Sequence, residues 1–173
     1  LTLPASAPLE LGVDLLQNGT GPVLLGADLI TSAQPVSFAS AVELIGPVSV
    51  LTGGGGGDVV FSSAVDGAFE LDVVSGVGTT SFTGPIGDAT PPAGISAVST
   101  VAVSFADTVT VGVGGLDVSG GAVTLAGDVS TTGGAVTIAG PLTLAADIAV
   151  ATADGVVSIG STVDGGFDLA INS

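Results

Sequence analysis

Seven amino acids are missing from this 173-residue chain: Lys, Arg, His, Cys, Met, Trp and Tyr. Without Lys and Arg, nothing neutralises the 16 acidic side chains, and the formal net charge is -16. Nucleic acid is excluded as a partner, because phosphate binding depends on basic side chains. The sequence instead predicts cationic partners, above all divalent cations such as Ca²⁺.

The same absences limit the catalytic chemistry. A serine nucleophile would have no His, Lys or Tyr as its base, and the chain offers neither a thiolate nor an imidazole metal ligand. Paired carboxylates, as in glycoside hydrolysis, are the remaining alternative. That reaction would also need aromatic and basic groups to hold a sugar. We therefore expect a protein that is not an enzyme and has no catalytic residues.

Long hydrophobic runs are also missing. Hydrophobic residues make up 46% of the chain and the mean hydropathy is +0.84, but Gly, Ser, Thr or Asp interrupts each run. No run approaches the roughly 18 residues that a membrane-spanning helix requires. The 29 Gly residues, together with many Val and Thr, predict strands and turns rather than helices. Without cysteine there is no disulfide framework.

An internal repeat of about 100 residues organises the chain. Residues 9–52 align without a gap with residues 109–152, and 13 of the 44 aligned positions are identical. Residues 59–75 then align with residues 157–173, with 8 of 17 positions identical. The chain therefore contains one complete unit and part of a second.

We assign residues 1–100 to the first unit and residues 101–173 to the partial second unit, with no linker between them. Neither end carries a helical cap over its strand edges, although Pro4 and Pro8 weaken the first edge. We expect the chain to belong to a longer repetitive protein or to have neighbours that cover its ends. Copies of the chain, joined end-to-end or side-by-side, are the predicted partners.

A shorter pattern recurs within the unit: apolar, any, apolar, three small or polar residues, apolar. Its copies begin at residues 3, 23, 36, 59, 80, 103, 123, 136 and 157. Five steps lead from residue 3 to residue 103, so the mean spacing is 20 residues. The step of 13 from Val23 to Val36 indicates that one copy lies on a different side of its turn of chain.

This spacing predicts an all-β fold, a parallel β-solenoid with about 20 residues per coil and five coils per unit. In such a fold, inward Val, Ile, Leu and Phe side chains stack on those of the next coil. The alternative is a pair of tandem immunoglobulin-like β-sandwiches, whose antiparallel strands recur at similar intervals. The absence of Trp and Tyr and the five-fold pattern within one unit favour the solenoid.

Five aspartates are the candidate metal ligands: Asp28, Asp58, Asp66, Asp128 and Asp164. Asp58 follows Gly53–Gly57 and completes one copy of a calcium-binding nonapeptide, but calcium rolls need consecutive copies. A turn before a strand is the favoured interpretation of this segment. The other four form two pairs at matching positions of the repeat, where Asp is usually a turn former. Cation bridging is the alternative, with Ca²⁺ as the one candidate cofactor.

Residues 57–71 read Gly-Asp-Val-Val-Phe-Ser-Ser-Ala-Val-Asp-Gly-Ala-Phe-Glu-Leu, and residues 121–138 read Gly-Ala-Val-Thr-Leu-Ala-Gly-Asp-Val-Ser-Thr-Thr-Gly-Gly-Ala-Val-Thr-Ile. Both resemble the repeat regions of large bacterial exoproteins, the filamentous-haemagglutinin-like β-strand-repeat proteins of the two-partner-secretion type. The resemblance extends over nearly the whole chain. It implies a right-handed β-helix, secretion, and a role in adhesion, biofilm or surface filaments.

We therefore expect a structural extracellular protein, a rigid shaft or filament segment on a bacterial surface or in a biofilm matrix. The alternative is an adhesin whose side binds a glycan or another surface. A carboxylate-dependent glycosidase is the remote alternative.

Overall fold

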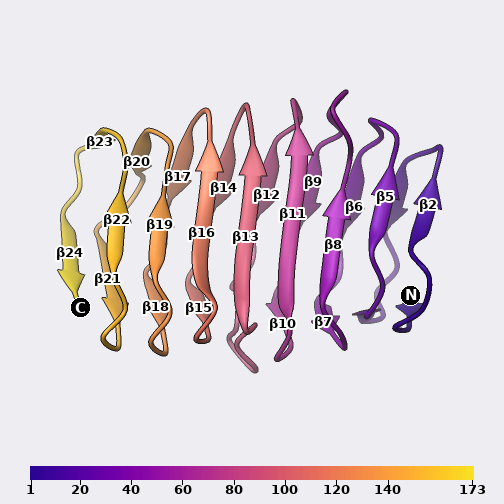
Figure 1. The fold of residues 1–173 in the computed structure, drawn as a ribbon, viewed down its shortest axis with the longest axis horizontal. Coiled ribbons are helices and arrows are strands. Elements are labelled where there is room, and N and C mark those ends of the chain that lie inside the picture. The colour runs from indigo at the N-terminus through magenta and orange to yellow at the C-terminus, as the bar shows by residue number, and fades with distance from the viewer.

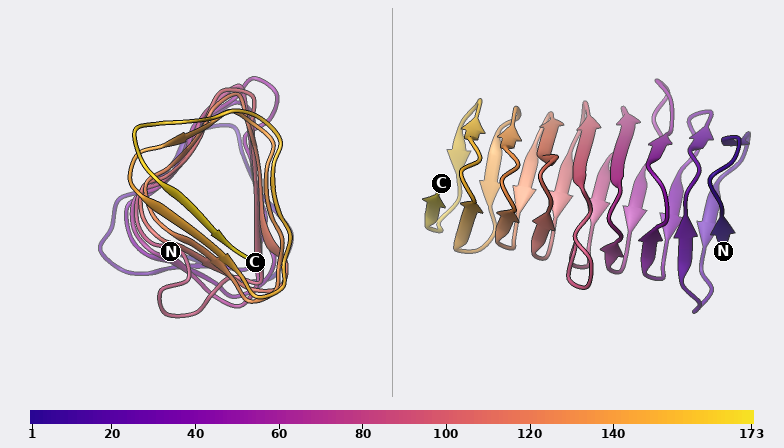
Figure 2. Two further views of the ribbon diagram at one scale, coloured as in Figure 1. Left: turned by 90° about the vertical axis from the view of Figure 1, so that its left-hand side faces the viewer. Right: turned by 60° about the horizontal axis from the view of Figure 1, so that its bottom comes forward.

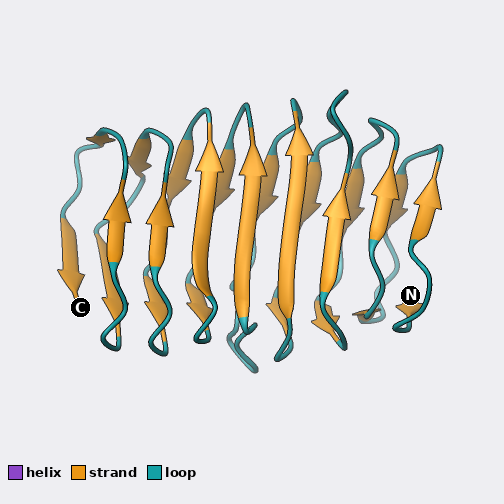
Figure 3. Cartoon of the chain, viewed as in Figure 1, coloured by secondary structure: helices purple, strands orange, loops and turns teal.

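Short strands form where two apolar residues flank one outward residue. In Val23–Leu25, for example, the first and third side chains are buried and the second is half-buried. Three such strands, separated by corners, make one coil of about 21 residues, and about eight coils stack along one axis. The computed structural model describes residues 1–173 as a β-solenoid without any helix (Figures 1 and 3).

The solenoid has three faces, and its cross-section is triangular (Figure 2). Face A contains β1 (Thr2–Leu3), β4 (Val23–Leu25), β7 (Val42–Leu44), β10 (Val65–Asp66), β15 (Val109–Val111), β18 (Val129–Thr131), β21 (Ile148–Thr152) and β24 (Leu169–Asn172). Face B contains β2 (Leu9–Leu11), β5 (Leu29–Thr31), β8 (Val48–Leu51), β11 (Glu70–Gly76), β13 (Gly94–Ser99), β16 (Gly115–Gly120), β19 (Val136–Ile138) and β22 (Val157–Ile159). Face C contains β3 (Leu15–Gln17), β6 (Val36–Phe38), β9 (Val59–Phe61), β12 (Thr80–Phe82), β14 (Val103–Phe105), β17 (Val123–Leu125), β20 (Leu142–Leu144) and β23 (Val163–Asp164).

Face A consists of two four-stranded halves. Isolated bridges from Ile86 to Val65 and to Val109 join them, so the face continues through the coil that has no regular strand there.

Strands of each face pair in parallel with those of the next coil, for instance β6 with β9 and β14 with β17. In Figure 1 the face-B strands in front point up, the face-C strands behind point down, and the chain advances to the left. The solenoid is therefore right-handed. The predicted β-solenoid is confirmed, and the sandwich alternative is wrong because its strands would pair antiparallel.

One continuous core fills the interior. It comprises 33 buried side chains between Val23 and Val150, most of them Val, Leu, Ile and Phe. On face C, Phe38, Phe61, Phe82 and Phe105 lie in register and stack ring on ring, with centroids 4.9–5.3 Å apart. Leu125 continues the same row in the next coil. The interior is therefore built from rows of like side chains that run along the axis.

The sequence repeat and the coil do not coincide. Residues 9–11 and 109–111 are equivalent in sequence, yet the first lie on face B as β2 and the second on face A as β15. Counting Ile86 as the face-A position of its coil, β15 lies fourteen strand positions after β2. The unit thus spans four coils and two further strands, one strand short of the five coils predicted. Each unit is rotated by one face relative to its predecessor.

The 13-residue steps in the sequence pattern mark this rotation. The step from Val23 to Val36 covers two strands and moves the pattern from face A to face C. The equivalent step from Val123 to Val136 moves it from face C to face B. The 13-residue step therefore marks a change of side, as predicted, but not by one copy alone: β6, β9, β12, β14 and β17 all lie on face C after it.

Candidate functional site

The first pair of candidate aspartates lies at the corners that precede β5 and β18. Oδ1 of Asp28 accepts a hydrogen bond from the backbone N–H of Ser49 at 2.8 Å, and Oδ1 of Asp128 accepts one from Ala149 at 2.7 Å. Donor and acceptor lie 21 residues apart in both cases. Each carboxylate therefore ties its coil to the next one, where the sequence predicted a bond within the local turn.

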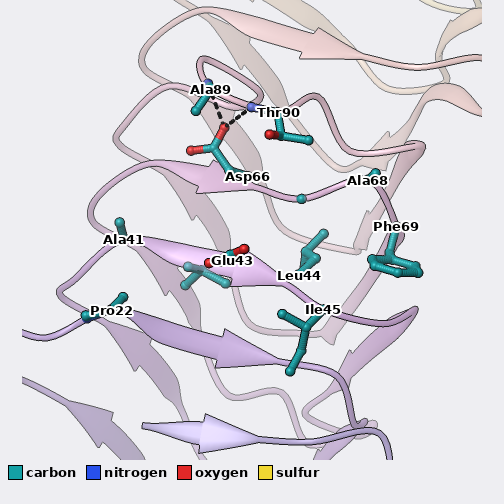
Figure 4. Close-up of a pocket in the computed structure, with 12 residues that line it drawn as sticks. Pro22, Ala41, Glu43, Leu44, Ile45, Asp66, Ala68, Phe69, Ala89 and Thr90 are labelled. Atoms are coloured by element: carbon teal, nitrogen blue, oxygen red, sulfur yellow. Dashed lines mark hydrogen bonds between the residues drawn. The ribbon is translucent and has the colours of Figure 1, made fainter.

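The second pair, Asp66 and Asp164, ends β10 and β23. Oδ1 of Asp66 accepts hydrogen bonds from the backbone N–H groups of Ala89 and Thr90 in the following coil, at 2.9 and 3.0 Å (Figure 4). Oδ1 of Asp164 instead accepts one from its neighbour Gly165, at 2.7 Å. The predicted local turn bond is therefore present at Asp164, where β23 is the last strand of face C.

Asp58 also bonds to the next coil. Its Oδ1 accepts hydrogen bonds from the backbone N–H of Thr79 at 2.7 Å and from the Thr79 hydroxyl at 2.8 Å. The backbone bond first, and then the hydroxyl bond, lower the pKa of Asp58 below its ordinary value of 3.8. The arrangement favours the charged carboxylate.

The glycine run before Asp58 is explained by close packing between coils. A Cβ atom on Gly57 would lie 2.2 Å from the carbonyl oxygen of Gln34 in the preceding coil. Gly56 has a φ of +69°, a backbone conformation that residues with a side chain rarely adopt. The segment is a corner whose shape requires glycine at these two positions.

The five aspartates are not brought together. Asp28 and Asp58 lie at corners that lead into faces B and C, and Asp128 lies at a corner that leads into face A. Asp66 ends a strand of face A, and Asp164 ends a strand of face C in the last coil. No group of three acidic side chains is close enough to hold one metal ion. The chemistry that these carboxylates perform in the structure is hydrogen bonding, four of the five between coils.

A groove of about 570 Å³ lies on face A beside β7 and β10 (Figure 4). The half-exposed side chains of Ile45 and Phe69 line it together with Ala68, so part of its wall is apolar. Glu43 and Asp66 are register partners on the two strands, and both line the groove, although the Asp66 carboxylate is directed at Ala89 and Thr90 of the following coil (Figure 4). An apolar wall beside two carboxylates suits a ligand that has both apolar and cationic or hydroxyl groups.

A smaller groove of about 250 Å³ lies at the corner that leads into face A near the C-terminal end. Asp128, Asp147 and Asp168 line it, and Oδ1 of Asp147 accepts a hydrogen bond from the backbone N–H of Asp168 at 3.0 Å. The bond between Asp147 and Asp168 joins two successive coils, like the bond that Asp28 accepts. Asp147 therefore also accepts a hydrogen bond between coils at a corner.

Sequence reasoning missed Glu43, Asp147 and Asp168. Their equivalents in the other unit are Thr143, Pro47 and Glu70, so comparison of the units did not single them out. It also missed the role of the buried hydroxyls, although the repeat carried a signal for them.

Thr31 and Thr52 are identical to Thr131 and Thr152, and all four side chains are buried. The hydroxyls of Thr31 and Thr52 donate to the carbonyl oxygens of Gln34 and Gly57, at 2.6 and 2.8 Å. Those of Thr131 and Thr152 donate to Gly134 and Gly155 at the equivalent corners, one face away.

Comparison of this chain with protein-family models, with curated proteins and with solved structures found no match.

Proposed function

We propose that this chain is an extracellular structural protein, a segment of a rigid β-solenoid shaft or filament on a bacterial surface or in a biofilm matrix. The observation that carries the proposal is the unbroken core of 33 buried side chains, whose rows run along the axis. Stretching the rod would separate the stacked side chains of every row, and bending it would separate those on the convex side, so either deformation would expose apolar area to water. A continuous core of this kind resists deformation along its whole length.

The distribution of charge supports the same role. All 16 acidic side chains are outside the core, and no basic side chain accompanies them. The resulting repulsion keeps neighbouring shafts apart and the rod in solution, and it attracts cations from the medium. The resemblance to the repeat regions of secreted bacterial exoproteins adds the expectation of an extracellular location.

Immunogold electron microscopy of the native cells tests this proposal. An antibody raised against the 173-residue chain is expected to label material outside the cell envelope, along fibres or matrix strands. Pre-immune serum is the control for non-specific labelling. Gold confined to the cell interior would overturn the proposal.

An adhesin is the second candidate, and the groove beside β7 and β10 favours it. Ile45 and Phe69 expose apolar surface there beside the carboxylates of Glu43 and Asp66. Sugar rings bind in this way, with their C–H faces on an aromatic ring and their hydroxyls on carboxylates. In this reading the shaft would carry a binding site on one side.

A glycan array probed with the purified chain distinguishes the two candidates. An adhesin that uses the groove would bind a defined group of glycans, and Phe69→Ala would reduce binding at least about ten-fold because it removes the aromatic wall. Phe167→Ala is the matched control, since Phe167 is the repeat equivalent of Phe69 and is also exposed, but does not line the groove. If Phe69→Ala and Phe167→Ala bind alike, the groove is not the site.

A further inference from the structure

The groove beside β7 and β10 is held in shape by hydrogen bonds between coils. Residues 45–47 and 67–69 form short corners between faces A and B, and residues 87–93 form a longer corner in the next coil. Two backbone N–H groups of this longer corner donate to the carboxylate of Asp66 (Figure 4), and the N–H of Gly67 donates back to one of its carbonyl oxygens at 2.9 Å. The groove is therefore formed before any ligand binds.

Phe69, the aromatic residue of the groove, is fixed through its backbone. Its N–H donates to the carbonyl oxygen of Gly67 at 2.9 Å, and its own carbonyl oxygen accepts a bond from the N–H of Ala93 at 3.0 Å. In Figure 4 the side chains of Phe69 and Ile45 lie on the same side of the groove. A ligand that stacks on this ring meets an apolar surface that is already in place, so little ordering entropy is lost.

The two carboxylates give the groove a charge that nothing in the chain neutralises. Glu43 is exposed on β7 and accepts no hydrogen bond, and both bonds to Asp66 are accepted by Oδ1, which leaves Oδ2 for a ligand. Because the chain has no Lys, Arg or His, a second copy would bring no cationic side chain to this site. A positively charged ligand from another source is attracted by both carboxylates and by the net charge of -16.

The coil itself does not require the charge or the apolar bulk found here. Glu43 and Ile45 correspond to Thr143 and Ala145 in the second unit, where the strand and corner form with these smaller side chains. Glu43 and Ile45 are therefore departures from the repeat, and both lie in the groove beside Phe69.

These features together define the chemistry of the ligand. Its positive charge meets the carboxylates, its apolar surface meets Phe69, and its hydroxyl groups meet the exposed hydroxyl of Thr90. A metal ion has no use for the apolar wall, and a lysine side chain has no hydroxyl groups. A sugar ring with a free amino group has an apolar C–H face, an ammonium group and hydroxyls.

We propose that this groove binds a glycan whose sugars carry free amino groups, with a ring face on Phe69 and ammonium groups on the carboxylates of Glu43 and Asp66. This inference rests on the adhesin candidate for the function and specifies its ligand as a cationic glycan. The groove volume of about 570 Å³ lies within the roughly 300–1,000 Å³ of small-molecule sites, so it suits a short stretch of such a glycan.

Isothermal titration calorimetry with a linear trimer of glucosamine tests the proposal. The titration is run at low salt and about pH 6, below the roughly 7.7–8.0 at which an α-amino group titrates, so that the amines are charged. The same trimer with acetylated amines keeps the rings and removes the charge. A trilysine peptide with a blocked N-terminus keeps the ammonium groups and removes the rings.

The glucosamine trimer is expected to bind at least about ten-fold more tightly than either control, since only it can use the ring and the carboxylates together. Tighter binding of the acetylated trimer would overturn the cationic ligand and leave the adhesin candidate standing. Equal binding of trilysine would overturn the sugar, because the site would then recognise basic peptides.

Matched variants locate the binding in the groove. Glu43→Gln should weaken binding of the glucosamine trimer at least about five-fold, because it removes a carboxylate that contacts the ligand. Asp117→Asn removes the same charge at an exposed position on face B and should change the affinity less than about two-fold. All three positions, Glu43, Phe69 and Asp117, are exposed, and melting curves check that their variants fold.

Phe69→Ala should weaken binding of the trimer at least about ten-fold, and Phe167→Ala should leave it unchanged. Equal losses from Glu43→Gln and Asp117→Asn would show that the trimer binds the diffuse charge of the rod and would overturn the site. No binding of either sugar trimer would also overturn the inference. The adhesin candidate then depends on the glycan array, and the structural role on immunogold labelling.

Discussion

Individual residues are used in this chain mainly to close corners. Asp carboxylates outside the core accept hydrogen bonds from backbone N–H groups of the next coil, and Thr or Ser hydroxyls inside it donate to corner carbonyls. No buried side-chain nitrogen or oxygen lacks a hydrogen-bond partner. With no Lys, Arg or His to pair with, the corner aspartates Asp28, Asp58, Asp66 and Asp128 obtain their compensation from N–H and O–H donors of the next coil.

Asp58→Asn tests this role through its pH dependence. The bonds from Thr79 depress the pKa of Asp58 in the folded chain, so its charge stabilises the fold above the ordinary value of 3.8. That stabilisation is lost as the pH falls through the lower folded value. Because the side chain is exposed, we expect Asp58→Asn to lower the free energy of unfolding by only about 0.5–1 kcal/mol near neutral pH.

Urea unfolding of wild type and Asp58→Asn, from about pH 7 down to about pH 2, provides the measurement. The difference between the two proteins should shrink toward zero at the acid end. Asp88→Asn is the matched control, since the carboxylate of Asp88 is exposed and accepts no hydrogen bond in the structure. A difference for Asp58→Asn that does not change with pH would contradict the assignment.

At the scale of the strand, the row of stacked phenylalanines on face C is the largest feature of the core. The rings of Phe61, Phe82 and Phe105 are nearly parallel, with interplanar angles of 1°. The same row continues as Leu125 and Leu144, so a leucine fits the space of one ring position. Substitutions in this row can therefore test whether the core depends on the volume of the side chain or on contacts between aromatic rings.

Substitutions of Phe82 measure the two requirements. Phe82 is 1% exposed and stacks on a ring at each side, so Phe82→Ala should cost about 3–5 kcal/mol of unfolding free energy. Phe82→Leu keeps most of the volume and should cost only about 1–1.5 kcal/mol. Both values are measured by chemical denaturation.

Phe69→Ala is the control for the loss of an aromatic ring at the surface, since Phe69 is 39% exposed. It should cost less than about 1 kcal/mol. If Phe82→Leu proved as costly as Phe82→Ala, the ring contacts rather than the filled volume would dominate the row.

The short β-strands and the length of the coil could be predicted from the sequence, because both follow from the local alternation of apolar and polar residues and from its recurrence. Val36-Ser-Phe38 reads as in, out, in without knowledge of any other coil, and its recurrence gives the stack. The bonds of Asp28 and Asp58 could not be predicted in the same way, because their donors are 21 residues away and their identity depends on the register between coils. The groove at Phe69 was missed for a similar reason, since it forms only where two successive corners leave space between them.

At the scale of the whole molecule, charge of a single sign is the dominant feature. The 16 carboxylates surround an apolar interior, and their mutual repulsion is present in the folded rod and reduced in the expanded unfolded chain. Screening this repulsion should therefore stabilise the fold. The Debye length falls from about 30 Å at 0.01 M salt to about 10 Å at 0.1 M, so most of the change is expected in this range.

The melting temperature measured in NaCl is expected to rise over that range and then level off. CaCl₂ and MgCl₂ at the same ionic strength separate screening from binding. If the three salts give the same melting temperature, the carboxylates act as a diffuse field. A further rise that is specific to Ca²⁺ and reversed by EDTA would instead establish a calcium site and contradict the assignment of the aspartates to hydrogen bonding alone.

The one-face offset between the repeat units also bears on how such a gene can grow. Equivalent stretches of the repeat, Leu9–Leu11 and Val109–Val111, fold on face B as β2 and on face A as β15, so the same apolar alternation suits more than one side of the triangle. A duplicated DNA segment therefore needs to encode a whole number of strands, not a whole number of turns. Recombination at any corner then preserves a closed interior, and a lineage can lengthen such a rod in steps as small as one side of its triangle.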